Sequence, residues 1–147
     1  MDQRIDKVDK SEFQEIVNIW EASVRATHDF LTEEDIEYFK PLILNQYLDA
    51  VSLSCIRDDE KKILGFMGVT GQSLEMLFVH PKAIGTGIGK SLISHAIDDL
   101  NIIKVDVNED NEHAVRFYER FGFQVIKRSP VDDLGKPYPI LHMTLVK

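Results

Sequence analysis

The spacing of apolar residues switches several times between helical and alternating, and each switch marks an expected element. Apolar side chains recur at helical spacing over residues 13–24, and Ser11 can cap that helix. A second helix is expected to begin at Thr32, where acidic residues follow and favour the positive end of the helix dipole. Pro41 is expected to break or restart this second helix.

Two further helices and a series of strands complete the pattern. Residues 88–100 have helical spacing, and a fourth helix is expected between Asn111 as its cap and Gly122 as the residue that closes it. Alternating or β-branched apolar runs predict strands at residues 4–8, 51–56, 62–70, 74–79, 102–107, 123–127 and 140–146. The expected order is strand, two helices, three strands, helix, strand, helix, two strands.

Residues 74–92, LEMLFVHPKAIGTGIGKSL, combine a strand, a glycine loop and the start of a helix. The apolar run ends before Pro81, which cannot extend a ladder of backbone hydrogen bonds, and three glycines then alternate over residues 85–89. Glycine lets the chain turn tightly and lets a ligand approach the main chain, and the first turn of a helix has N–H groups without helical partners. These features predict an anion site, most simply a phosphate site.

Two familiar phosphate loops do not fit the spacing of these glycines. A Walker loop needs a glycine where Ile84 stands, and a dinucleotide-binding fingerprint that starts at Gly85 needs one where Lys90 stands. Asp106 lies roughly where the ribose-binding acid of that fingerprint would fall. A nucleotide-phosphate binder therefore stays a less favoured alternative, which competition by ATP would expose.

The loop instead resembles the pyrophosphate loop of the GNAT superfamily, the acyl-coenzyme A-dependent N-acyltransferases. The usual pattern, Gln/Arg-x-x-Gly-x-Gly, falls on residues 84–89, with Ile84 in place of the basic or amide residue. Main-chain donation to the pyrophosphate would survive this departure, but one side-chain contribution is lost or moved to Lys82 or Lys90.

A second motif strengthens the resemblance. Residues 111–118 match the family element Asn-x-x-Ala-x-x-Phe-Tyr, and the Gly-Phe pair that follows it falls at residues 122–123. Residues 23–31 and 131–139 also look like segments of a small bacterial branch of the family typified by YjaB. Two independent motifs in the right order, with a helix and a strand between them, are more specific than either one alone.

The resemblance implies an α/β fold of the GNAT type, with a mixed central sheet of six to seven strands flanked by about four helices in one domain, residues 1–147. It also implies an N-acetyltransferase that moves an acetyl group from acetyl-coenzyme A directly to a primary amine. The pantetheine arm is expected to lie along the strand before the glycine loop. The implied cofactor-binding residues are Leu77, Phe78, Val79, Gly85, Thr86, Gly87, Ile88, Gly89, Lys90 and Asn111.

Tyr118 is the residue to which the resemblance assigns protonation of the departing thiolate. A phenol with a pKa of ~10 is protonated at neutral pH and can donate. The helical stripe that Tyr118 shares with Phe117 also fits a core aromatic whose hydroxyl finds a partner. In the same way, Asn111 fits a helix cap as well as a contact to coenzyme A.

Three residues are candidates for the acceptor side of the reaction. Glu75 stands in an apolar strand on the face shared with Leu77 and Val79, where a charged carboxylate is costly, and it fits either a base acting through water or an edge-exposed or salt-bridged residue. His28 lies between the first two helices, where family members place part of the acceptor site, and His142 lies on a late strand. Either histidine can line the acceptor pocket, act as base or be structural.

Composition narrows the class of partner. The net charge is −8 and the basic residues form no stripe, which disfavours nucleic acid and suits a cationic amine from a small molecule or a protein.

The sequence shows no sign of a metal site or a membrane segment. Cys55 is the only cysteine and the histidine spacing suggests no metal site. No apolar run approaches the ~20 residues that span a bilayer, and the first ten residues hold no apolar secretion segment.

We therefore expect a cytoplasmic protein, monomeric or homodimeric, without a membrane partner or a metal. A second hypothesis from another class is a coenzyme A-binding sensor or regulatory module with little turnover. The two separate on whether Tyr118→Phe leaves cofactor binding intact while abolishing transfer.

Overall fold

The computed structural model describes residues 4–146. Within that range the α-helices are α1 (Phe13–Thr27), α2 (Glu33–Leu42), α3 (Ile88–Asp99) and α4 (Glu112–Arg120). The strands are β1 (Asp6–Lys7), β2 (Ser52–Arg57), β3 (Ile63–Thr70), β4 (Ser73–Val79), β5 (Lys104–Asn108), β6 (Phe123–Ser129) and β7 (Ile140–Leu145). Short helical turns lie at Lys10–Glu12, Ile43–Tyr47, Leu48–Ala50 and Pro81–Ala83.

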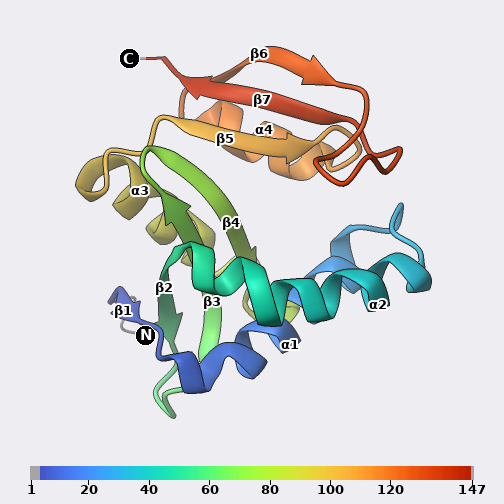
Figure 1. Cartoon of the computed structure of the whole chain (residues 1–147). Coiled ribbons are helices and arrows are strands. Elements are labelled where there is room, and N and C mark those ends of the chain that lie inside the picture. The colour runs from blue at the N-terminus through green and yellow to red at the C-terminus, as the bar shows by residue number, and fades with distance from the viewer. Residues whose placement is uncertain (1–3, 147) are drawn as a thin grey trace.

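The described strands form one seven-stranded sheet in the order β1-β2-β3-β4-β5-β7-β6. Only β4 and β5 run parallel, and every other neighbouring pair in this described sheet is antiparallel. The predicted mixed sheet flanked by helices is thereby confirmed (Figure 1).

The sheet opens between its two parallel strands. The pairing of β4 with β5 is confined, among the described residues, to Ser73 with Lys104 and Leu74 with Val105. Beyond these pairs the strands diverge, and β4 continues beside β3 while β5 continues beside β7 (Figure 1). The edge of β4 that faces the opening therefore has backbone groups that no strand pairing uses.

Two groups of buried side chains hold the layers together. One group packs α3 and α4 against the sheet, with Leu92 and Tyr118 among its members. The other packs α1 and the turns after α2 against the opposite face around Phe66 and Trp20. Because both faces of β3 and β4 are covered, their position under the site is fixed by packing on two sides.

Gly65 lets α3 approach β3 closely. A Cβ atom at Gly65 would lie 2.8 Å from Cγ2 of Ile88 and 3.2 Å from the carbonyl oxygen of Phe78. This contact sets the first turn of α3 directly behind the end of β4.

The described helices include none with the length and apolar character that crossing a bilayer requires.

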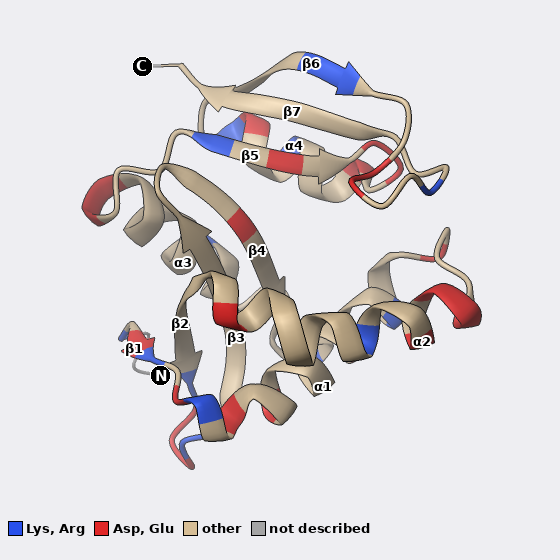
Figure 2. Ribbon diagram, in the orientation of Figure 1, with Lys and Arg blue, Asp and Glu red and all other residues tan. Residues whose placement is uncertain are grey.

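Lys and Arg residues are spread over separate elements, whereas α2 opens with the acidic residues Glu33, Glu34 and Asp35 (Figure 2).

Several expected boundaries were wrong for local reasons. Pro41 does not break the second helix: α2 includes it and continues into a wider π-type turn at Ile43–Tyr47. The lost donor is tolerated because Ile43 and Leu48 are buried and hold the following turns in place. Ser11 does not cap α1, because it lies inside the short turn that precedes that helix.

The strand ends also shifted by a few residues. The first strand is only Asp6–Lys7 rather than residues 4–8, and β5 begins at Lys104 rather than at Ile102, which is buried ahead of it. Gly122 closes α4 as expected, with a φ of 99°.

We expect Gly65→Ala to destabilise the protein by about 1–3 kcal/mol, because the added methyl group has no room beside Ile88. Urea denaturation monitored by fluorescence measures this change. Ser52→Ala, at an exposed position of β2, serves as control and should change stability little. Equal midpoints for Gly65→Ala and the wild type would contradict the close approach of α3.

Candidate active site

A cavity of about 1010 Å³ occupies the opening between β4 and β5. Its walls come from α1, β4, the glycine loop, β5, α4 and the loop between β6 and β7. The predicted site residues that line it are His28, Glu75, Leu77, Phe78, Val79, Gly85, Gly87, Gly89, Lys90, Asn111 and Tyr118. Thr86, Ile88 and His142 are not among the described residues that line it.

The glycine loop leads directly into α3. Gly85 and Gly87 have φ values of 85° and 88°, in the left-handed region that favours glycine. Gly87 is the N-cap residue of α3, and no side chain caps this end of the helix within the described structure. The first-turn N–H groups therefore have no acceptor within the helix, and the helix dipole favours an anion beside them.

The side chains of this loop divide between core and solvent. Ile88 is 1% exposed and packs into the core, so it can meet a ligand only through its main chain. The Thr86 hydroxyl donates to the Ala83 carbonyl oxygen at 2.5 Å. Ile84 is exposed, as are Lys82 and Lys90, the two candidates to replace its missing basic side chain.

The three cofactor residues predicted on β4 have alternating side chains. Leu77 and Val79 pack toward α3 and α4, while Phe78 packs toward α1. Their main chain pairs with β3 on one edge and borders the cavity on the other. An extended ligand could therefore add to this free edge in the manner of a strand.

Glu75 is exposed, in line with the edge-exposed alternative, and it does not share the apolar face of Leu77 and Val79 on which the alternation had placed it. The register between β3 and β4 shifts so that Val69 pairs with Leu74 and Gly68 with Met76, and Glu75 is the extra residue of a bulge. Leu74 rather than Glu75 accordingly shares the core of Leu77 and Val79. The Glu75 carboxylate accepts a hydrogen bond from the Thr70 hydroxyl at 2.8 Å.

Tyr118 is 7% exposed and lies on α4 at the wall of the cavity. Its ring packs edge-on against Phe117 and Phe123, with centroids 5.3 and 5.8 Å away. Burial raises the pKa of the Tyr118 phenol, so this hydroxyl stays protonated and able to donate.

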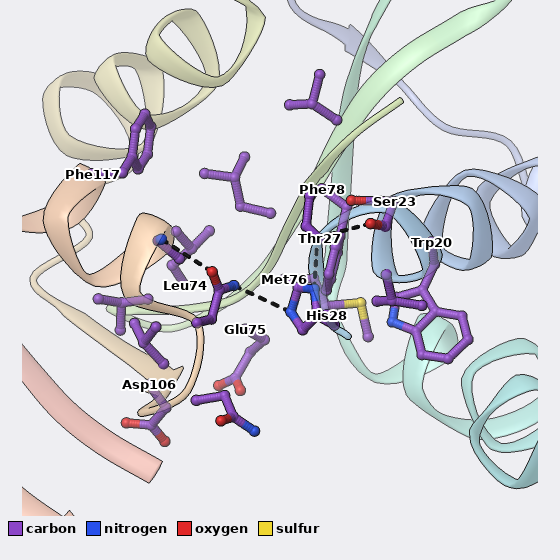
Figure 3. Close-up of a pocket in the computed structure, with 18 of the residues that line it drawn as sticks. Trp20, Ser23, Thr27, His28, Leu74, Glu75, Met76, Phe78, Asp106 and Phe117 are labelled. Carbon is purple, nitrogen blue, oxygen red and sulfur yellow. Dashed lines mark hydrogen bonds between the residues drawn. The ribbon is translucent and has the colours of Figure 1, made fainter. Parts of the chain in front are cut away.

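His28 and Asn111, predicted as separate acceptor and cofactor contacts, hydrogen bond to each other. The Asn111 Nδ2 atom lies 3.2 Å from His28 Nε2, and Asn111 Oδ1 accepts from the Ala114 N–H at 3.2 Å, so Asn111 also caps α4 (Figure 3). Burial lowers the pKa of His28 to about 4. The imidazole is therefore neutral at physiological pH.

The contacts of His142 do not support its predicted role at the acceptor site. Its Nε2 atom lies 2.7 Å from the Ser129 hydroxyl and its Nδ1 atom 2.8 Å from an Asp106 carboxylate oxygen. Both ring nitrogens are engaged on the sheet, and of these three residues only Asp106 is among the described cavity-lining residues. The structure does not bring His142 into the pocket with His28.

Sequence reasoning missed a cluster that joins α2 to the β6–β7 loop. The Asp35 carboxylate is buried, accepts a hydrogen bond from the Tyr138 hydroxyl and lies 3.2 Å from Lys136 Nζ. The Tyr138 ring lies 6.0 Å from the ring of Phe30. The only local signal was an aromatic residue within a polar loop, which does not identify its partner.

Residues 27–144 match the acetyltransferase (GNAT) domain family, and the chain therefore belongs to that family. The predicted fold and the prediction of an N-acetyltransferase are confirmed, and the coenzyme A sensor gains no support.

The relatives agree with the expected bacterial branch. The chain is 42% identical to the peptidyl-lysine N-acetyltransferase YjaB of Escherichia coli K12, over 92% of this chain and 91% of that protein. The solution structure of apo-form YjaB from Escherichia coli has a TM-score of 0.91 at 40% identity, covering 99% of each chain. The PaiA N-acetyltransferase of Thermoplasma acidophilum, crystallised with coenzyme A, shares the fold with a TM-score of 0.72 at 20% identity, over 97% of this chain and 98% of that one.

We expect His28 to make folding less stable in acid. The unfolded chain binds a proton at its ordinary pKa of 6.5, whereas burial holds the folded pKa at about 4. The stability that His28 contributes is therefore fully present above pH 6.5 and is lost as the pH falls toward 4.

Urea denaturation of the wild type and of His28→Phe at pH 7 and pH 4.5 measures this contribution. The wild type should lose roughly 2 kcal/mol more than the variant between the two pH values. An identical loss in both proteins would contradict a buried neutral His28.

Proposed function

We propose that this protein transfers an acetyl group from acetyl-coenzyme A to the side-chain amine of lysine residues in proteins. The observation that carries the proposal is the cavity between β4 and β5, which is lined by the glycine loop and also by the carboxylate residues Glu75, Asp132 and Asp133. The choice of a lysine acceptor is supported by the 42% identity to a peptidyl-lysine N-acetyltransferase. A small-molecule amine is the remaining acceptor class.

The donor would be held mainly by main-chain groups. The first-turn amides of α3 and the turns at Gly85 and Gly87 suit a pyrophosphate, and the free edge of β4 suits the pantetheine arm. Coenzyme A is anionic and the protein carries a net charge of −8, so local donors rather than the overall field must supply the affinity. The PaiA enzyme that was crystallised with coenzyme A has the same fold.

The lining of the cavity suits an alkyl ammonium group. Asp132, Asp133 and Glu75 line the cavity, and the rings of Trp20 and Phe39 line it as well. Apolar rings can cover the methylene stem of a lysine while carboxylates stay near its charged end.

In the proposed reaction a C–N bond forms as a C–S bond breaks. The ammonium loses one proton through water to Glu75, and the neutral amine attacks the thioester carbonyl carbon, whose oxygen the β4 amides can polarise. The thiolate leaves with the C–S electron pair and takes the hydroxyl proton of Tyr118. The second amine proton returns through water to the Tyr118 oxygen, so the products are an amide and a free thiol.

Other expectations stay predictions. They are the single domain, the cytoplasmic location, the monomeric or homodimeric state, and the lack of a metal, nucleic-acid or membrane partner.

We expect Tyr118→Phe to lower turnover by about 10²-fold or more while coenzyme A affinity stays within a few-fold, because only the departing thiolate needs the hydroxyl. Thiol release with acetyl-coenzyme A and a lysine peptide measures turnover, and calorimetry measures binding. Tyr38→Phe, at an exposed tyrosine of α2, is the matched control. Full activity of Tyr118→Phe would remove it as the acid.

We expect Gly87→Ala to weaken coenzyme A binding by about tenfold or more, because a side chain at its left-handed φ strains the turn that presents the α3 amides. Gly71→Ala is the control. It imposes similar strain, at a φ of 55°, in a turn where the added Cβ atom would have no neighbour within 4 Å. Calorimetry on both variants separates strain from ligand contact, and equal affinities would place the pyrophosphate elsewhere.

A further inference from the structure

One hydrogen bond crosses the cavity between parts of the chain that are far apart in sequence. His28 is the C-cap residue of α1 and Asn111 is the N-cap residue of α4, and the bond between them spans 83 residues. Figure 3 shows it as a dashed line that reaches the His28 ring. We call this pair the His28–Asn111 clasp.

The neighbours of the clasp fix the direction of every hydrogen bond in it. The Thr27 hydroxyl donates its one hydrogen to the Ser23 carbonyl oxygen at 2.8 Å, so it can only accept from His28 Nδ1, 2.7 Å away. His28 Nε2 is then a lone-pair acceptor, and the Asn111 amide donates to it. The Asn111 orientation follows independently, because Oδ1 is used by the Ala114 N–H.

The environment of His28 suits an acceptor rather than a base. Its ring lies against Phe30 and Phe78, with centroids 5.2 and 6.3 Å away, and burial lowers the pKa of the imidazole to about 4. A lysine ammonium has an ordinary pKa of about 10.4, so proton transfer from it to such an imidazole would be strongly unfavourable. A neutral imidazole that only accepts a hydrogen bond needs no such transfer.

The clasp joins the two sides of the opening. α1 packs on β3 and β4, whereas α4 packs on β5 and β6. Tyr118 follows Asn111 by two turns on α4. A bond between the end of α1 and the start of α4 therefore restrains the distance between Tyr118 and β4 across the cavity.

We propose that His28 is a positioning residue for acetyl transfer, whose Nε2 atom holds Asn111 and thereby sets the Tyr118 hydroxyl against the thioester sulfur carried by β4. This inference rests on the proposed function, because it takes Tyr118 as the acid. In this arrangement Nδ1 donates to the Thr27 hydroxyl and Nε2 accepts from Asn111, so neither ring nitrogen is available to take a proton from the acceptor amine.

The test compares His28→Phe, which keeps a ring and removes the acceptor, with His28→Gln, whose amide oxygen can accept from Asn111. We expect His28→Phe to lower kcat by about 10–100-fold with little change in KM for acetyl-coenzyme A, since misplacement of a reacting group by ~1 Å costs about that much. His28→Gln should recover most of kcat and keep the wild-type pH dependence. His95→Gln controls for loss of a histidine, because His95 lies on α3 and is not among the described residues that line the cavity.

Two outcomes would overturn the inference. If His28→Phe keeps full kcat, the clasp positions nothing; if His28→Gln is as slow as His28→Phe and loses the acid limb of the kcat profile, His28 is a base. Nitrogen NMR of the ring gives a readout besides activity: we expect protonated Nδ1 and an Nε2 shift that moves in Asn111→Ala.

A double variant separates this inference from the proposed function. If His28 acts through Tyr118, adding His28→Phe to Tyr118→Phe should lower kcat no further. Full activity of Tyr118→Phe alone would reject the proposed acid, whereas loss of activity in Tyr118→Phe with full activity in His28→Phe would reject only the clasp.

Discussion

The site depends on the point at which β4 stops pairing with β5. The two strands share pairs only at Ser73 and Leu74 among the described residues, and the bulge at Glu75 follows at once. Backbone N–H and C=O groups are rarely left without hydrogen-bond partners in a protein. The groups on the free edge of β4 are therefore expected to bond to an added strand, to water or to a ligand. The cavity of about 1010 Å³ at this edge provides the space for a ligand.

Close packing holds the opening in its shape. The lack of a side chain at Gly65 on β3 makes room for Ile88 at the start of α3. A Cβ atom at Gly89 would lie 3.6 Å from the Phe117 ring and 3.7 Å from Val79, so the start of α3 meets both α4 and β4. Independently of this packing, the His28–Asn111 clasp ties the C-cap of α1 to the N-cap of α4. The opening therefore has packed or hydrogen-bonded supports on both sides, which suits a site that must hold two reactants in one geometry.

Features that depend on a few consecutive residues could be predicted from the sequence. The glycine loop, the Asn111 cap and the Gly122 stop were predicted because each follows from a few consecutive side chains. The bulge that takes Glu75 off the apolar face was not predicted, since it comes from a register shift against β3 that no spacing in β4 reveals. The Asp35–Tyr138 contact spans 103 residues, and such a pairing is set by the tertiary fold alone.

The most direct test of this account is a crystal structure of the protein with coenzyme A bound. We expect the pyrophosphate at the amides of residues 87–90 and the pantetheine arm hydrogen bonded to the free edge of β4 at residues 77–79, with its sulfur within reach of the Tyr118 hydroxyl. Coenzyme A bound away from the opening between β4 and β5, with the edge of β4 left unpaired, would show that this opening is not the cofactor site.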